Sequence, residues 1–428
     1  MATTGTTVLN NLMRQTLAPK VVESFHNDPI LLMILDDINS RRVNAKGEDI
    51  AIRTRPSPSF GALGESSLLP EAGAPSWAKF NILNKLHYAQ GEISGLVHLM
   101  QDIDTIPGGK AKVKEVGGML AYMIDKETDD FKRKLNQLAY GTGNGALGSP
   151  ITAITTGAGG TFTINPAASH NGADFIPLGA QIQFYTVAGV IHDQTGAVPF
   201  SRVTGTNYAT GVITCDNIPT NAVVGDIVVY KDSYGNSMNG LRGLIQDSNI
   251  TFQGVNVTNE PNLKGNVHDA ASGNWSQQAI DRMLTRTKIR AGINRPVNDF
   301  VILTHPVQSD AVRNAGYALN SVTTGSDRAA GKLDLGFPLI STNGMRIRED
   351  VDCGKGDMFG FRLSNLIRYA LKEPGLMEII DGHMLAPKPG NGNYYHIQQY
   401  AFCFIGNLAT QDPASNWYIR NLAYSGLG

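Results

Sequence analysis

Three glycines in the stretch QLAYGTGNGALGSP have the spacing of a nucleotide-binding motif. Gly143, Gly145 and Gly148 spell G-x-G-x-x-G, which binds a dinucleotide pyrophosphate where it follows a strand and opens a helix. Here a helical pattern comes before the glycines and the strand-like ITAITT comes after them, so no helix N-terminus is in position to meet a phosphate. We predict that Gly141 caps the helix in the left-handed conformation and that the later glycines form a turn.

The remaining reactive side chains form no recognisable catalytic or metal-binding pattern. The nine histidines are dispersed, and the closest pair on one segment, His87 and His98, has no further ligand at metal-binding spacing. Asp102 and Asp104 precede a long helix, where carboxylates favour the positive helix end; a catalytic pair is the alternative. The sequence contains no H-E-x-x-H, P-loop or G-x-S-x-G motif. We expect no catalytic residue, no metal site and no cofactor.

The cysteines and the apolar runs indicate the cellular compartment in which the protein acts. Cys215, Cys353 and Cys403 lie far apart without a C-x-x-C motif, which is typical of a reducing compartment and not of a disulfide scaffold or a zinc site. The first residues lack the basic segment and apolar core of a signal peptide. The longest dense apolar run, from Ile30 to Leu35, is much shorter than the ~20 residues of a membrane span. We expect a soluble protein that acts inside a cell and has no membrane partner.

Charge and glycine content narrow the class of protein. The chain has 428 residues, enough for about three domains of ordinary size. Only 17% of the residues are charged, against about 25% in typical soluble proteins, and the net charge of −1 argues against nucleic-acid binding through bulk electrostatics. Glycine is abundant, with 47 residues. These features indicate many turns and large subunit interfaces, with a large β-rich monomer as the alternative.

The strongest helical periodicity runs from 110 to 141. Apolar residues recur there at three- and four-residue steps, and charged residues occupy the other face. The pattern predicts one amphipathic helix of roughly 30 residues, about 45 Å long. The residues that we assign to its core-facing side are Val113, Val116, Leu120, Ile124, Phe131 and Leu135.

A stretch from 56 to about 85 combines loop composition with large apolar side chains. It is rich in Pro, Gly and Ser, yet exposure of its apolar residues would cost free energy unless something covers them. It is therefore either a loop that folds onto its own domain or an extended hairpin that reaches a neighbouring subunit. The apolar residues concerned are Phe60, Leu63, Leu68, Leu69, Trp77 and Phe80.

The rest of the chain alternates between strand-like and helical patterns. From 151 to about 258, short alternating runs between turn residues predict a small all-β module, a barrel or a sandwich. The other predicted elements are helical pieces over 6–40, strand-like sequence over 41–55, helices over 275–293, from 307 and near 363–371, strands over 300–304, 344–348, 376–380 and 394–404, and a mobile loop over 318–336.

The order of these parts, together with several short phrases, resembles the major capsid proteins of tailed bacteriophages, which have the Hong Kong 97-type fold. The phrases are LPEAG at 69–73, QLAYGTGNG at 137–145, DGH at 381–383, QDPA at 411–414 and YIRNL at 418–422. The resemblance implies an α+β protein with a long spine helix, an extended loop and an inserted all-β domain. The implied divisions are an N-terminal arm and first strands (1–55), an extension loop (56–88), a peripheral domain with the spine helix (89–150), an all-β insertion domain (151–257), a continued peripheral domain (258–294), an axial domain (295–390) and a closing strand of the peripheral domain (391–428).

The same resemblance implies a structural role and not an enzymatic one. Copies of the chain would self-assemble, as pentamers and hexamers, into the icosahedral head shell of a virion, in the cytoplasm of a host bacterium. The six apolar residues of the extension loop would make inter-subunit contacts. The chain has no highly charged helical segment of about a hundred residues at its start to serve as a built-in scaffold, so a separate scaffolding protein is implied. A portal, a possible cement protein and packaged double-stranded DNA without sequence-specific contact complete the implied partners.

Three alternatives remain open at this point. The first is an encapsulin-type nanocompartment, which shares the implied fold. The second is a β-rich enzyme, which would need a carboxylate pair that we do not find. The third is a tail or adhesion protein, which would show internal repeats. Some capsid proteins crosslink through a Lys–Asn bond. Lys79 and Lys85 lie in or beside the loop, but we identify no matching Asn and acid and expect no crosslink.

Overall fold

A computed structural model describes most of the chain. The described residues are 29–38, 40–44, 46–62, 68, 71, 73–94, 114–152, 154–164, 175–192, 200–207, 210–248, 251–258, 260–274, 276–292, 300–313, 340–342, 345–378, 386–389 and 394–423. The chain divides into two compact units, and each is described by itself. The first comprises Met1–Pro29, Leu86–Leu135 and Ala370–Gly406; the second comprises Ile30–Lys85, Asn136–Tyr369 and Asn407–Gly428.

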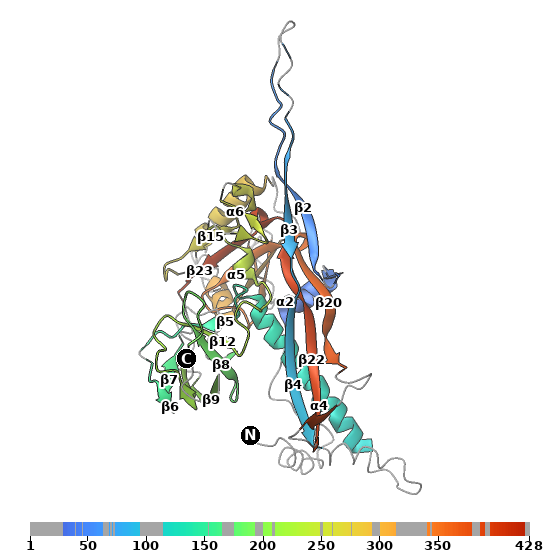
Figure 1. The fold of residues 1–428 in the computed structure, drawn as a ribbon. Helices are drawn as coiled ribbons and strands as arrows, with labels where there is room; N and C mark the ends of the chain where they lie inside the picture. Colours follow the sequence, from blue (N-terminus) through green and yellow to red (C-terminus); the bar gives the residue numbers. More distant parts are fainter. Residues whose placement is uncertain are drawn as a thin grey trace, which may run out of the picture. The chain divides into compact units, whose positions relative to one another are not determined.

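The first unit is built on a sheet of long strands and one long helix. The sheet order is β20-β22-β21, and β4 also pairs with β22. The short β1, which pairs with β20, belongs to the second unit, as do Leu366–Tyr369 of β20 and Asn407–Thr410 of β22. The long helix, α4, runs beside β4 and β22 in Figure 1. The elements are β1 (Ser40–Arg42), β4 (Lys85–Ser94), α4 (Lys114–Ala139), β20 (Leu366–Met377), β21 (Ala386–Pro389) and β22 (Tyr394–Thr410).

The helix expected over 110–141 is confirmed as α4 over Lys114–Ala139. It packs on β22 through Phe131, whose ring stacks on that of Phe402 with centroids 6.1 Å apart. Phe131 and Leu135 are buried and Ile124 is half-buried, as the periodicity predicts. Of the other three core-facing residues, Val116 and Leu120 lie in the helix but their side chains are outside the described part, as is the whole of Val113.

The second unit contains a six-stranded mixed sheet with the order β15-β23-β19-β16-β18-β17. β15 is parallel to β23 and β16 is parallel to β18, whereas the other neighbours are antiparallel. The strands are β15 (Asn266–Asp269), β16 (Phe300–Thr304), β17 (Ile340–Thr342), β18 (Met345–Glu349), β19 (Met358–Arg362) and β23 (Trp417–Arg420).

Helix α6 (Gln277–Ala291) covers this sheet. Its Ile280 and Met283 belong to one buried cluster with Ile302 and Trp417. The Ser276 side chain accepts a hydrogen bond from the Ala279 N–H at its start, and Gly292 ends it in the left-handed conformation, the cap residues expected for both ends. The sequence predictions of a helix over 275–293 and a buried strand over 300–304 are confirmed.

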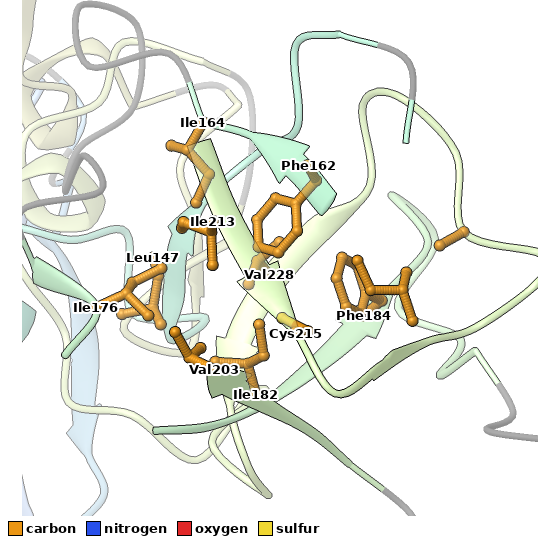
Figure 2. Close-up of a cluster of buried hydrophobic side chains, with 12 residues drawn as sticks. Leu147, Phe162, Ile164, Ile176, Ile182, Phe184, Val203, Ile213, Cys215 and Val228 are labelled. Carbon is orange, nitrogen blue, oxygen red and sulfur yellow. The ribbon is translucent and has the colours of Figure 1, made fainter. Parts of the chain in front are cut away.

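The β-rich segment forms a small barrel within the second unit. Its six strands pair in the order β5-β12-β8-β9-β10-β7, and an isolated bridge between Pro150 and Ile164 joins the ends of β5 and β7. Figure 2 shows side chains from these strands, among them Phe162, Phe184 and Ile213, gathered in a common interior. The strands are β5 (Ala146–Gly148), β7 (Thr161–Thr163), β8 (Gln181–Tyr185), β9 (Ser201–Asn207), β10 (Val212–Cys215) and β12 (Ile227–Tyr230).

Several short elements complete the second unit. They are α2 (Ile30–Ile38), α5 (Leu241–Leu244), the paired β6 (Gly157–Ala158) and β11 (Asn217–Ile218), the paired β13 (Thr251–Phe252) and β14 (Val255–Asn256), the 3-10 turns η3 (Pro261–Leu263), η4 (Leu363–Asn365) and η5 (Pro413–Ser415), and a helical run over 306–313. That run agrees with the helix expected from 307, and β18 and β22 agree with the strands expected over 344–348 and 394–404.

One predicted helix is wrong. The segment near 363–371 begins as the turn η4 and continues as strand β20 to Met377. Residues 366–370 are all buried, Arg368 included. The segment therefore lacks the alternation of a half-exposed strand, and spacing alone does not distinguish it from a helix. Of the strand expected over 376–380, residues 376 and 377 are the last two of β20, Glu378 lies outside the strand, and 379–380 are outside the described residues. The loop expected over 318–336 lies outside the described residues.

Candidate assembly hairpin

Strands β2 (Glu48–Arg55) and β3 (Ser76–Ile82) form a two-stranded antiparallel ribbon. Figure 1 shows this ribbon in blue as a long hairpin. In its register Ile50 lies opposite Phe80 and Arg53 lies opposite Trp77, and a bulge follows Arg53. A two-stranded ribbon without further strands is only marginally stable in water, so its anchorage and its exposed side chains decide what it can do.

The base of the hairpin is anchored in its own chain. Phe80 is fully buried, with its ring edge-on to Phe252 at a centroid distance of 5.4 Å, and the Asn81 N–H donates to the Gln253 carbonyl at 2.8 Å. The expectation that Phe80 contacts a second subunit is therefore wrong, because β13 and its turn already cover it. Alternation along β3 gives this result: Phe80 shares a face with Ile82, which is also buried.

A second close contact holds the same base. Ile82 belongs to a buried cluster with Tyr369 and Ala409. Gly47, just before β2, has a φ of +91°, and a Cβ there would lie 2.0 Å from the Ile82 carbonyl oxygen. Only glycine allows both that backbone conformation and that approach, so the lower part of the hairpin has a fixed position in the second unit.

The outer part of the hairpin presents large apolar side chains to solvent. Phe60 is 92% exposed, Leu68 is 91% exposed and Trp77 is 62% exposed. Leu63 and Leu69 lie outside the described residues. Exposed apolar groups of this size mark surfaces that another molecule covers, so for Phe60, Leu68 and Trp77 the inter-subunit contact expected from the sequence remains a prediction that the exposure favours.

Beyond the bulge, serine hydroxyls keep the two arms side by side. The Ser57 Oγ donates to the Gly73 carbonyl at 2.6 Å, and the Gly73 N–H donates to the Ser59 Oγ. A Cβ at Gly73 would lie 2.4 Å from the Cγ of Pro58, so the close approach requires glycine. These bonds continue the pairing of β2 and β3 where the regular ladder has ended.

Ion pairs along the ribbon are exposed. The Lys79 Nζ lies 2.5 Å from an Asp49 carboxylate oxygen, and an Arg55 guanidinium nitrogen lies 2.8 Å from Glu260. Exposed pairs of this kind contribute about 0–1 kcal/mol, so they align the strands more than they stabilise them. The amine of Lys85, the other lysine considered for a crosslink, donates to the Gly235 carbonyl at 2.7 Å.

The glycine motif has the structure of a turn. α4 ends at Ala139 and β5 begins at Ala146, and between them Gly143 and Gly145 have φ values of +89° and +80°. The helix-then-strand order is thus confirmed, and this segment opens no helix. The left-handed cap expected at Gly141 is wrong, because Gly141 is not among the positive-φ glycines.

Gly240 and Gly243 permit close packing of their backbone on that of Gly141 and Thr142. A Cβ on Gly240 would lie 2.4 Å from the Gly141 carbonyl oxygen, and a Cβ on Gly243 would lie 2.4 Å from the Thr142 carbonyl oxygen. The segment that follows α4 therefore packs directly on α5, and the glycines serve that contact.

A buried polar cluster that sequence reasoning missed lies next to the end of α4. The Tyr140 hydroxyl donates to Asp350 Oδ2 at 2.7 Å, and the Asn136 amide donates to Asp350 Oδ2 at 3.1 Å and to Asp352 Oδ2 at 2.8 Å. Asp350 and Asp352 are almost fully buried. Burial, followed by the neighbouring Asp350, raises the pKa of Tyr140 well above its ordinary value, so the hydroxyl remains a proton donor.

A second buried group contains an ion pair. The Arg242 guanidinium contacts the Asp357 carboxylate, which also accepts from the Tyr418 hydroxyl at 2.8 Å. Burial, followed by Asp357, raises the pKa of the nearby Cys353 thiol well above its ordinary value, which makes this cysteine unreactive. Among the described residues no group of three or more His, Cys, Asp or Glu side chains could hold a metal ion.

Those of the other residues considered for chemistry that the structure describes are not gathered into a site. Cys215, Cys353 and Cys403 are buried and carry free thiols. The His87 ring lies 5.9 Å from that of Phe404, whereas His98, Asp102 and Asp104 fall outside the described residues. In the part of the chain that the structure describes, no helix is sufficiently long and apolar to cross a membrane.

Comparison with known proteins identifies the fold. No protein-family model and no curated protein sequence matches the chain. Among solved structures, the chain is similar to one in the cyanophage A-1(L) capsid asymmetric unit, with a TM-score of 0.56 and 12% identity over 96% of this chain and 99% of that one. The capsid of the native GTA particle matches at 0.47, with 10% identity over 95% of both chains. The SrpI encapsulin of Synechococcus elongatus matches at 0.37, with 10% identity over 97% of this chain and 98% of that one. On the first of these comparisons, the chain has the fold of a phage capsid protein.

Proposed function

We propose that this chain is the major capsid protein of a tailed bacteriophage, and that many copies assemble into an icosahedral head shell around double-stranded DNA. The observation that carries the proposal is the likeness to the cyanophage capsid chain over 96% of this chain and 99% of that one. An anchored hairpin with exposed Phe60, Leu68 and Trp77 supports it independently. On this proposal the role is structural, and the chain catalyses no reaction.

The elements take the roles of a Hong Kong 97-type subunit. α4 is the spine helix, the hairpin of β2 and β3 with its tip is the extension loop, and the barrel is the insertion domain. Strands β16 to β19 of the six-stranded sheet lie in the segment 295–390, which we assign to the axial domain around five- and six-fold axes, whereas β15 and β23 of the same sheet lie in segments that we assign to the peripheral domain. The segments 89–150, 258–294 and 391–428 form the peripheral domain, and 1–55 supplies the N-terminal arm.

Assembly on this proposal is a matter of geometry. Head-to-tail contacts between copies close into rings when the rotation between them is a symmetry of the shell. The hairpin base is fixed by Phe80 and Gly47, so its outer part extends from the subunit in a defined direction. We infer that Phe60, Leu68 and Trp77 pack on a neighbouring copy, where burial of large apolar groups contributes about 25 cal/mol for each Å² removed from water.

The composition supports the proposed partners. A net charge of −1 lets a shell enclose DNA without the strong phosphate binding that a basic protein would show. We propose further that a separate scaffolding protein directs assembly, that a portal occupies one vertex, that a cement protein is a possible addition, and that the mature protein resides in the virion after assembly in the host cytoplasm.

Electron microscopy of the purified chain, together with its mass from light scattering, tests the proposal. Round shells with a mass of many subunits are expected, alone or with scaffolding protein from a phage lysate. Particles isolated from a lysate should contain DNA, whereas an encapsulin shell would contain a protein cargo. A chain that stays a monomer or dimer in every condition would contradict the proposal and would favour the β-rich enzyme.

A further inference from the structure

One end of the barrel gathers three loops from separate parts of the chain. Tyr185 at the end of β8 pairs with Ile227 at the start of β12, so the turn 186–191 and the turn 219–226 lie at the same end. The Gly225 N–H donates to the Pro150 carbonyl at 3.1 Å, which brings Ile151 to this end as well. The three segments therefore form one continuous surface of the barrel.

This surface is apolar. Six branched aliphatic side chains there are between 39% and 78% exposed. Among the described residues of the three segments, the only charged or titratable side chains are His192 and Asp226, which are buried and lie 2.8 Å apart. We call the six residues the apolar end of the barrel: Ile151, Val187, Val190, Ile191, Val223 and Val224.

The loops that carry the apolar end are held by hydrogen bonds. The Val190 N–H donates to the Thr186 hydroxyl at 3.1 Å, and the Thr186 N–H donates to the Val190 carbonyl at 2.8 Å. On the other turn, the Val223 N–H donates to Asp226 Oδ2 at 2.7 Å. Each turn is thus closed on itself, and the two turns approach each other where His192 Nε2 lies 2.8 Å from Asp226 Oδ2.

We propose that the apolar end packs against the apolar end of a second copy of this chain within the assembled shell. The inference rests on the proposed capsid function. Two features favour a second copy as the occupant. The described residues of this surface carry no exposed charge, so they can pack against the same residues of a second copy without like-charge repulsion. Six residues are also far fewer than the 20–30 residues a side, about 800 Å² per partner, of an interface that holds free molecules together.

The small size of the apolar end fits a contact that forms only inside a larger assembly. Where other surfaces already hold two copies in place, a weak contact acts at a high effective concentration and needs no affinity of its own. Under the proposed function, the contacts that the hairpin makes with a neighbouring copy hold the two copies in place. In the unassembled chain the apolar ends stay apart, and in the shell they meet.

Cysteine crosslinking tests the contact directly. The three native cysteines are buried, so single Val187→Cys, Val190→Cys and Val224→Cys variants place one reactive thiol at the surface. Shells of each variant are treated with copper–phenanthroline and analysed by non-reducing gel electrophoresis. Leu178→Cys is the matched control, because Leu178 is 65% exposed and precedes β8 at the opposite end of the barrel.

We expect disulfide-linked chains from at least one apolar-end variant in shells, monomers from the same variant before assembly, and monomers from Leu178→Cys in both states. A second measurement uses Val224→Lys and Val224→Glu chains. Each alone is expected to give fewer shells, and a mixture of the two is expected to restore the yield because opposite charges then meet.

Three results would overturn the inference. Shells without any crosslink, and with no recovery in the charge mixture, would leave the capsid function standing and remove the contact between apolar ends. Equal crosslinking of the Leu178→Cys control would show that collision and not contact links the chains. A different polypeptide crosslinked to the apolar end in purified heads would assign this surface to an accessory protein. Absence of shells from the unaltered chain would instead refute the proposed function and the inference with it.

Discussion

The hydroxyl of Tyr140 donates a 2.7 Å hydrogen bond to the carboxylate of Asp350, a residue 210 positions later in the chain. Both side chains are buried. Asp350 also accepts from the backbone N–H of Leu31 in α2 and from the Asn136 amide. One carboxylate thus joins α2, the end of α4 and the segment after β18.

Replacement of Tyr140 by Phe tests this junction. The substitution removes one donor and leaves Asp350 with its other partners, so we expect the unfolding free energy to fall by about 1–3 kcal/mol, as when a buried acceptor loses a partner. Denaturant unfolding of the unassembled chain measures it. Tyr185→Phe, at a half-exposed tyrosine in the barrel, is the control and should change stability by less than about 0.5 kcal/mol. Equal losses of unfolding free energy from the two substitutions would show that the Tyr140–Asp350 hydrogen bond makes no particular contribution to stability.

The Arg242–Asp357 pair gives a second prediction. Arg242→Met leaves the Asp357 carboxylate buried without its cation, and we expect a loss of about 3–5 kcal/mol in the unfolding free energy. The double variant Arg242→Met/Asp357→Asn removes both charges and should recover most of that loss. A double-mutant cycle by chemical denaturation measures the coupling, and strictly additive effects would show that the two charges do not interact.

A third prediction separates the two aromatic residues of β3. Trp77→Ala should reduce or misdirect shell assembly and leave the melting temperature of the unassembled chain unchanged, because Trp77 is largely exposed. Phe80→Ala should lower the unfolding free energy by about 3–5 kcal/mol, because it creates a cavity beside Phe252. Assembly yield by light scattering and thermal unfolding measure the two effects. Normal shells from Trp77→Ala would remove the role assigned to the hairpin.

The pH dependence of stability gives a fourth prediction, at Glu127. Burial raises the pKa of the Glu127 carboxyl above its ordinary value of 4.5, and the bond from the Tyr400 hydroxyl only partly opposes the rise. The folded state therefore binds this proton more tightly than the unfolded state, so the associated stability is present below the ordinary pKa and is lost as pH rises through the raised pKa.

Glu127→Gln isolates that contribution. The stability of the natural chain relative to this variant should be greater near pH 4 than near pH 7, since other acidic groups titrate alike in both proteins. Thermal unfolding at the two pH values measures the difference. A difference of the opposite sign would mean that the Tyr400 hydrogen bond outweighs burial.

Local patterns were sufficient for the elements whose residues interact with near neighbours in sequence. The 3.6-residue repeat predicts α4, and Ser276 and Gly292 bound α6 closely. The same reasoning failed for 363–371, because a strand buried on both faces lacks the alternation that identifies an exposed strand.

The features that could not be predicted from the sequence depend on contacts between residues that are far apart in the chain. Phe80 and Trp77 look alike in a loop rich in Pro, Gly and Ser, and only the contact with Phe252 shows that one is buried. Asn136 and Asp350 are 214 positions apart, so no spacing rule could connect them. Gly141 matched a cap position, yet its backbone instead packs against Gly240, a contact that depends on the packing of α5.

A reconstruction of assembled particles by electron cryomicroscopy tests the central claim most directly. We predict a continuous icosahedral shell into which copies of this chain fit, with the hairpin of each copy lying on a neighbour and Trp77 buried in that contact. A shell formed by another polypeptide, or a shell of this chain in which Trp77 remains in solvent, would contradict the account.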